Sequence, residues 1–219
     1  MVSLFAARGF ANADAVRNRF ERLPETADEL TAIGRFLGAG PEALLLRGRA
    51  TERNVKAADL SDIRVLVFAT HALVAGELKG LAEPTLVLTP PTTGSVEDDG
   101  LLTASEVAQL KLNADLVILS ACNTAAPDGT PGADALSGLA KAFFYAGSRA
   151  LLVSHWQTFS EAAVSLTTGM VAKMAQGVGR SEALRQSMLA VMNDRDNPHF
   201  AHPIFWAPFV VVGEGGRAS

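Results

Sequence analysis

Hydrophobic residues along the chain form short continuous runs instead of alternating with polar residues. The runs occur at residues 64–69, 85–89, 116–121, 149–154 and 208–213. Continuous apolar runs are typical of strands that are buried on both faces, as in a mainly parallel sheet covered by helices. A shorter apolar segment at 42–48 predicts one further strand. We therefore expect a central, mainly parallel sheet.

Segments with helical spacing or capping signals lie between these runs. Helices are predicted at residues 23–40, 51–60, 103–112, 134–147, 158–175 and 181–192. The pairs Thr26–Glu29 and Thr103–Glu106 have the spacing of a capping box, and Gly147 suits a helix end. Because strands alternate with helices, the pattern predicts an α/β protein.

The length of the chain fits one large domain. Its 219 residues are enough to bury a substantial core. Residues 1–22 are weakly patterned and are predicted to be a lead-in segment with room for one short helix. Residues 23–219 are predicted to form the domain itself.

Composition narrows the class of protein further. Hydrophobic residues make up 48% of the chain, and the net charge of −4 gives no basic field for a nucleic acid. One cysteine excludes an internal disulfide framework, which fits a reducing cytoplasm. No signal peptide or membrane-spanning run is apparent. We expect a cytoplasmic protein with neither a nucleic acid nor a membrane as its direct partner.

Two residues at predicted strand ends carry the candidate chemistry. His71 follows the run at 64–69, and Cys122, the only cysteine, follows the run at 116–121. Catalytic groups in open α/β sheets gather at the carboxyl ends of the strands. An imidazole there can deprotonate a thiol and later protonate a leaving amine. The backbone N–H groups of Cys122 and Ala72 are candidate oxyanion donors.

A structural role remains open for both residues on this evidence. A free cysteine is often buried, and a single histidine at a strand end is often only a satisfied polar group. The histidines at 199 and 202 form a local pair with too few ligands for a metal site, so no metal is expected.

The sequence around these residues resembles the CHAT domain, a caspase- and separase-like cysteine peptidase family of clan CD. The resemblance covers residues 22–213 and is carried by LPETADEL, ATERNVKAADLSDIRVLVFATHA, DDGLLTASEVAQLKLNADLVILSACNT, GLAKAFFYAGSRALLVSHW and HPIFWAPFVVVGEG. It implies a caspase-like three-layer α/β/α sandwich with a mainly parallel central sheet. It also implies His71 as general base, Cys122 as nucleophile and no cofactor.

Three features depart from the usual family pattern. Relatives often have glycine directly after the histidine and a few residues after the cysteine, where this chain has Ala72 and Ala125. After Trp156, relatives tend to have aspartates that meet a basic substrate side chain, whereas this chain has Phe159 and Ser160. A preference for basic residues therefore does not transfer from the family.

Other residues near the predicted site are candidates for contacting the substrate. They are His155, Trp156, Phe159, Ser160, Glu161, Asp128 and Asp134. Of these, Glu161, Asp128 and Asp134 are candidates to replace the missing aspartates. His155 is predicted either to be structural or to line the substrate pocket.

The sequence favours two functions over a third, an α/β small-molecule-binding domain of flavodoxin type, which the absence of a phosphate loop disfavours. The first is a cysteine endopeptidase that cleaves a protein or peptide substrate through Cys122 and His71. The resemblance suggests a bacterial protein regulated by an attached or partner helical-repeat or sensor module. The alternative is a catalytically inactive caspase-like module that binds other proteins.

Overall fold

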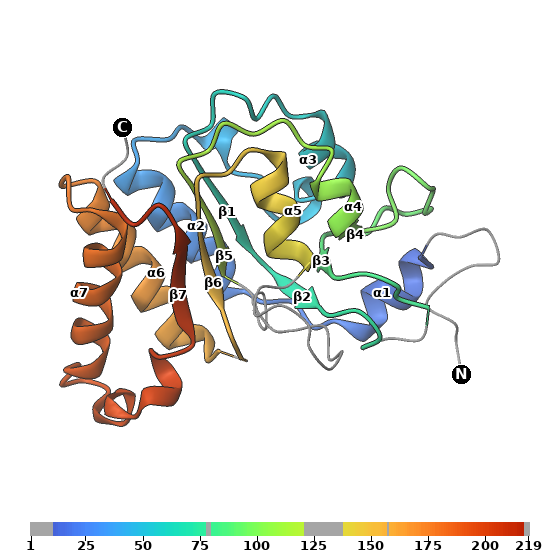
Figure 1. Cartoon of the computed structure of the whole chain (residues 1–219). Coiled ribbons are helices and arrows are strands. Elements are labelled where there is room, and N and C mark those ends of the chain that lie inside the picture. Colours follow the sequence, from blue (N-terminus) through green and yellow to red (C-terminus); the bar gives the residue numbers. More distant parts are fainter. Residues whose placement is uncertain (1–10, 78–79, 121–137, 157, 217–219) are drawn as a thin grey trace.

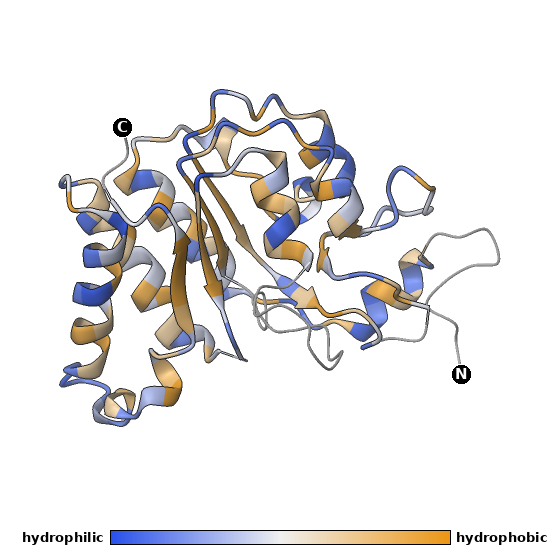
Figure 2. Cartoon of the chain, in the orientation of Figure 1, coloured by the Kyte–Doolittle hydropathy of each residue, from blue (hydrophilic) through white to orange (hydrophobic). Residues whose placement is uncertain are grey.

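The computed structural model describes residues 11–77, 80–120, 138–156 and 158–216. Its central sheet has four strands in the order β1 (Val65–Ala69), β5 (Leu116–Ser120), β6 (Ala150–Ser154) and β7 (Phe209–Gly213) (Figure 1). The first three strands are parallel, and β7 runs antiparallel to β6. The predicted mainly parallel sheet is confirmed. The strands are largely hydrophobic along their whole length, as expected for burial on both faces (Figure 2).

Helices cover both faces of this sheet and produce three layers. The helices α2 (Glu25–Phe36), α6 (Ser160–Met174) and α7 (Arg180–Met192) lie on one face. The helices α3 (Glu52–Ala57), α4 (Ala104–Val107) and α5 (Gly138–Ala146) lie on the other. Each strand serves both cores, because successive side chains point to opposite faces.

Strand β5 shows this alternation clearly. Leu116 and Ile118 pack into the core under α6 and α7, whereas Val117 and Leu119 pack into the core under α5. All four side chains are fully buried. Burial of a Leu, Ile or Val side chain stabilises a fold by about 1.5–3 kcal/mol, so β5 anchors both layers.

The direction of β7 follows from the path of the two preceding helices. Helices α6 and α7 pack side by side. The short 3-10 helices η3 (Pro198–Ala201) and η4 (Pro203–Phe205) then return the chain to the carboxyl end of β6. There Phe209 pairs with Ser154, and β7 runs back along the sheet.

A second, smaller sheet flanks the first. It consists of β2 (His71–Leu73), β3 (Thr85–Val87) and β4 (Leu101–Thr103), with antiparallel pairing throughout. The apolar run at 85–89 was expected in the central sheet, and this expectation is wrong in its placement. Its three strand residues are fully buried within the smaller sheet, so a two-sided buried pattern did not identify the sheet to which it belongs.

Helix α1 (Ala13–Arg19) packs on this smaller sheet. Ala11 and Val16 share a buried cluster with Leu73, Val87 and Leu101. Part of the predicted lead-in segment therefore contributes buried side chains to the fold, whereas the domain boundary at residue 22 stays a prediction.

The predicted strand at 42–48 is not present. The segment instead contains η1 (Pro41–Ala43) and η2 (Arg47–Arg49), with Leu44–Leu46 between them. The Arg49 guanidinium donates hydrogen bonds to the carbonyls of Pro41 and Leu44, which replaces strand pairing at these groups. Arg47 has a positive φ of 51°, which ends the extended conformation.

One of the two predicted capping boxes is present. Thr103 caps α4 and exchanges hydrogen bonds with Glu106, as expected. The Thr26–Glu29 box is wrong, because α2 begins after Pro24 with no side-chain cap. The Thr26 hydroxyl instead donates to the carbonyl of Leu23, and the carboxyl of Glu29 is buried elsewhere.

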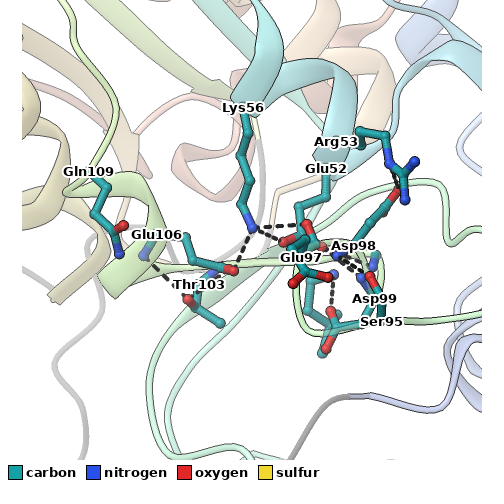
Figure 3. Close-up of polar contacts among 12 residues, drawn as sticks. Glu52, Arg53, Lys56, Ser95, Glu97, Asp98, Asp99, Thr103, Glu106 and Gln109 are labelled. Carbon is teal, nitrogen blue, oxygen red and sulfur yellow. Dashed lines mark hydrogen bonds and ion pairs between the residues drawn. The ribbon is translucent and has the colours of Figure 1, made fainter.

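A polar cluster attaches the loop before β4 to helix α3 (Figure 3). Lys56 donates to the carboxylates of Glu52 and Glu106. Glu52 also accepts the backbone N–H groups of Asp99 and Gly100 at 2.8 and 3.2 Å. Burial raises the pKa of Glu52 to about 7, although the hydrogen bond from Lys56 opposes this rise. This partly buried cluster holds the chain in place where it enters β4.

Gly147 provides a test of the packing behind β6. It ends α5 with a φ of 114°, and a Cβ placed there would lie 2.2 Å from the carbonyl oxygen of Leu112. We expect Gly147→Ala to lower the free energy of unfolding by more than about 2 kcal/mol, because strain at positive φ alone costs about 1–2 kcal/mol. Urea unfolding followed by circular dichroism measures this loss.

Gly177 is the matched control. It follows α6 with a φ of 85°, but a Cβ there meets nothing within 4 Å. Gly177→Ala is therefore expected to cost less than Gly147→Ala. Equal losses in the two variants would contradict the proposed contact with Leu112.

Candidate functional site

His71 lies immediately beyond the carboxyl end of β1. It is the first residue of β2, and only Thr70 separates the two strands. Its half-buried ring contacts the Phe20 ring at a centroid distance of 5.6 Å. Its Nε2 atom is 2.8 Å from the carbonyl oxygen of Glu21. A carbonyl accepts only from N–H, so this contact favours the tautomer with a proton on Nε2 and a free lone pair on Nδ1.

The register of the sheet relates His71 to the end of β5. In the parallel pairing of β1 with β5, Ala69 lies opposite Ser120, and all paired residues are 51 positions apart. His71 follows Ala69 by two residues, and Cys122 follows Ser120 by two residues. Cys122 itself lies outside the described residues, as do Ala125, Asp128 and Asp134. Their predicted roles stay predictions.

Ala72, a candidate oxyanion donor, lies within a strand. It is the second residue of β2 and lies opposite Leu86 of β3. The bend is at Thr70, whose hydroxyl donates to the carbonyl of Val87. This hydrogen bond holds the bend at Thr70, and Ala72 beyond it belongs to the smaller sheet.

The five remaining candidates lie at the carboxyl end of β6. His155, Trp156, Phe159, Ser160 and Glu161 all belong to the connection between β6 and α6 or to the first turn of α6, and all five are exposed. The backbone N–H of His155 donates to the carbonyl of Pro208 at 3.0 Å. Since β5 lies between β1 and β6, these residues and His71 flank the end of β5 from opposite sides.

His71 also lines a large cavity along the outer edge of β1. The cavity has a volume of about 1580 Å³ and extends between β1, helix α2 and the segment 44–46. Its walls include Ile33, Leu44, Leu46 and Val67. The missing strand at 42–48 therefore leaves an apolar space beside the candidate base.

A buried carboxyl group that the sequence pattern did not reveal lies next to the end of β5. Glu29 of α2 is 1% exposed and accepts a hydrogen bond from the Thr167 hydroxyl of α6 at 2.6 Å. Burial raises the pKa of Glu29, whereas hydrogen bonds from Thr167 and Ser120 act to lower it. Glu29 lies four residues before buried Ile33, and this helical spacing was the available signal that it faces the core.

Ser120 links this buried carboxyl to the candidate site. It is the last residue of β5, and its hydroxyl is a hydrogen-bond partner of Glu29. The contact joins α2, α6 and the strand end that precedes Cys122. Glu29 thus contacts the last residue of β5 from the helical layer that contains α2 and α6.

The layered architecture is that of the caspase-like cysteine peptidases. The chain superposes on the crystal structure of the Arg-specific cysteine proteinase gingipain R with a TM-score of 0.59 and 12% sequence identity. The superposition covers 87% of this chain and 42% of gingipain R. At this identity the likeness shows the fold, which is a caspase-like α/β/α sandwich with a mostly parallel central sheet.

The chain belongs to the CHAT domain family, whose profile matches residues 4–214. It is also 28% identical to mouse (Mus musculus) tetratricopeptide repeat protein 28 and 27% identical to the human (Homo sapiens) protein of the same name. Both alignments cover 87% of this chain but only 8% of the relative. The chain therefore spans a small fraction of the length of these relatives.

The described ranges contain no group of three or more potential metal-ligating side chains. Within the same ranges, no helix has the length and apolar composition needed to cross a membrane.

The buried carboxyl of Glu29 predicts a pH dependence of stability. Because its pKa is raised by folding, the native state holds the proton more tightly than the unfolded state. The free energy of unfolding should therefore fall as the pH rises above about 4.5, the ordinary value for glutamate. In Glu29→Gln the free energy of unfolding should fall less over the same pH range. The decrease that remains comes from other groups with raised pKa values, such as Glu52. Urea unfolding at pH values from 4.5 to 8 measures the slope.

Glu182→Gln is the control for this measurement. Hydrogen bonds from Arg185 and Gln186 lower the pKa of the exposed Glu182 to about 2, so its effect falls below pH 4.5. The Glu182 variant should keep the wild-type slope at pH 4.5–8. A Glu29 variant with an unchanged slope would show that this carboxyl is ionised in the native protein throughout the range.

Proposed function

We propose that the chain is a cysteine endopeptidase in which Cys122 is the nucleophile and His71 is the general base. The observation that carries the proposal is the position of His71 at the carboxyl end of β1, beside the strand that leads to Cys122. Membership of the CHAT family and the caspase-like fold support the same chemistry.

Chain connectivity supports the pairing of these two residues. Neighbouring strands lie about 4.8 Å apart, and two residues of extended chain span at most about 7 Å. Cys122 is two residues from Ser120, which is hydrogen-bonded into the sheet opposite Ala69. The distance from the fixed end of β5 is thus short enough for a thiol and an imidazole to meet.

The tautomer of His71 suits it to act as a base. Its Nε2–H is directed to the carbonyl of Glu21, which leaves the Nδ1 lone pair to accept the thiol proton. The resulting thiolate attacks the substrate carbonyl and forms a C–S bond, and the carbonyl oxygen takes the negative charge. When the oxyanion re-forms the carbonyl group, the C–N bond breaks and His71 gives its proton to the leaving amine. His71 then takes a proton from water as the water oxygen attacks the thioester carbonyl. The C–S bond breaks, the product acid leaves, and the Cys122 sulfur departs as the thiolate beside the protonated imidazole.

The contact to Glu21 also orients the ring. In catalytic dyads and triads, a third group that holds the imidazole improves proton transfer by fixing both tautomer and direction. Here a backbone carbonyl takes that position, and the Phe20 ring packs beside the imidazole. Both residues precede α2 and lie in a part of the chain that the sequence analysis had assigned to the lead-in.

Two backbone N–H groups are the oxyanion donors of this scheme. We propose the backbone N–H of Cys122 as one donor, with Ala72 as the second. Ala72 lies within β2 opposite Leu86. This position favours the alternative function, a caspase-like module without catalytic activity that binds other proteins.

Regulation by attached helical repeats is a further part of the proposal. The two curated relatives are named tetratricopeptide repeat proteins, and the chain aligns with 8% of their length. Repeat arrays present extended concave surfaces that bind other proteins. We propose that a helical-repeat or sensor module, attached or separate, controls access of a protein substrate to Cys122 in the cytoplasm of a bacterial cell.

Cleavage of a peptide library by the purified chain tests the catalytic proposal. We expect Cys122→Ala and His71→Ala each to lower kcat/KM by at least about 1000-fold, because each removes one half of a unit that works together. Arg35→Ala is the control: this exposed side chain at the end of α2 should leave cleavage unchanged. Cleavage that survives in either dyad variant would contradict the assignment, and binding of peptides without cleavage would support the alternative.

A further inference from the structure

Large apolar side chains are exposed at the carboxyl end of β6. Trp156 is 40% exposed, Phe159 is 49% exposed and Ile204 is 39% exposed. They come from two segments far apart in the sequence, the connection between β6 and α6 and the turn η4 before β7. Figure 1 shows both segments at the same end of the sheet. We call Trp156, Phe159, Ile204 and Phe205 the apolar rim.

Specific contacts hold the two segments of the apolar rim together. The rings of Phe159 and Phe205 lie 4.8 Å apart at their centroids. Phe205 in turn contacts the buried Phe200 ring at 5.0 Å, which connects the rim to the core beneath α7. Ser154 pairs with Phe209 at the base of the two segments. The exposed faces of the rim therefore rest on a fixed support.

The two segments that carry the apolar rim contain few charged residues besides the histidines at 155, 199 and 202. Residues 154–163 and 198–209 contain no lysine or arginine, and Glu161 is their only carboxylate. Glu161 is exposed in the first turn of α6, where its charge is solvated. A basic or an acidic substrate side chain would find no buried partner among these residues, whereas an apolar one would gain area removed from water.

The apolar rim flanks the candidate catalytic strand. β5 leads to Cys122 and lies between β1 and β6, so that His71 is on one side and the rim is on the other. A peptide whose scissile carbonyl meets Cys122 would extend its adjacent side chain over one of these two sides. The side of His71 must stay free for proton transfer to the leaving amine.

We propose that the apolar rim binds a large apolar side chain, aromatic or aliphatic, next to the scissile bond of the peptide substrate. This inference rests on the proposed function and adds the substrate class to it. Phe159 is then a specificity-determining residue. The tilted ring pair of Phe159 and Phe205, with Phe159 about half exposed, offers apolar surface for such a side chain.

Labelling of Cys122 by reactive peptides tests the inference in the active protein. The probes are acyloxymethyl ketones of one peptide with phenylalanine, leucine, arginine or aspartate next to the reactive group, and mass spectrometry follows the rate. We expect the phenylalanine and leucine probes to react at least tenfold faster than the other two. Phe159→Ala should slow the phenylalanine probe about tenfold without slowing the arginine probe.

Phe36→Ala is the matched control for the phenylalanine substitution. Phe36 is 46% exposed at the end of α2, outside the apolar rim, so that its removal should leave all four rates unchanged. Equal rates for all probes, or faster labelling by the arginine or aspartate probe, would overturn the inference. Such labelling would still support the cysteine nucleophile.

Binding to Cys122→Ala tests the apolar rim without catalysis. Calorimetry would compare a peptide aldehyde that carries phenylalanine with one that carries arginine. We expect the phenylalanine peptide to bind at least tenfold more tightly, and this preference should disappear when Phe159→Ala is added. If no probe labels the wild-type chain but this preference is found, the catalytic proposal fails and the apolar recognition stands. If neither peptide binds with a preference, the inference is overturned.

Discussion

The parallel pairing of β1 with β5 determines which chain positions meet at the edge of the sheet. Ala69 lies opposite Ser120, and the chain leaves both strands at the same level. The backbone hydrogen bonds of this pairing are buried between two helical layers, where an unpaired N–H or C=O group would cost about 1–3 kcal/mol. A shift of register would therefore expose apolar side chains and separate His71 from the end of β5.

The two helical layers give this edge its other groups. On one side of the sheet, α2 contributes Glu29, whose carboxyl contacts Thr167 of α6 and Ser120 of β5. The same α6 begins beside the apolar rim, so one helix contacts both the buried carboxyl and the exposed aromatic side chains. The candidate site thus depends on how α2 and α6 pack together on the sheet.

The sequence pattern was sufficient for the layers and for the place of His71 in the sheet. Continuous apolar runs report burial on both faces, which identified β1, β5, β6 and β7, and the strand-end position of His71 followed from them. The pattern could not distinguish the central sheet from the smaller one, because β3 is equally buried. Nor could it show that Arg49 would bond the carbonyl of Leu44 in place of a neighbouring strand.

The residues whose roles the sequence pattern did not reveal are held by contacts with distant parts of the chain. Glu29 has capping-box spacing from Thr26, but its position on the buried face of α2 decides its role. Asp98 is buried, and Asp99 accepts the N–H of Ala11, 88 residues away in the sequence. Contacts between distant segments such as these leave no local pattern in the sequence.

The most direct measurement is the rate at which iodoacetamide alkylates Cys122 as a function of pH, in the wild-type chain and in His71→Ala. Because this is the only cysteine, the reaction reports one thiol. If His71 forms a dyad with Cys122, the wild-type thiol should react at pH values well below about 8.5, the ordinary pKa of cysteine, and His71→Ala should abolish this reactivity. A single titration near 8.5 that is the same in both proteins would contradict the account.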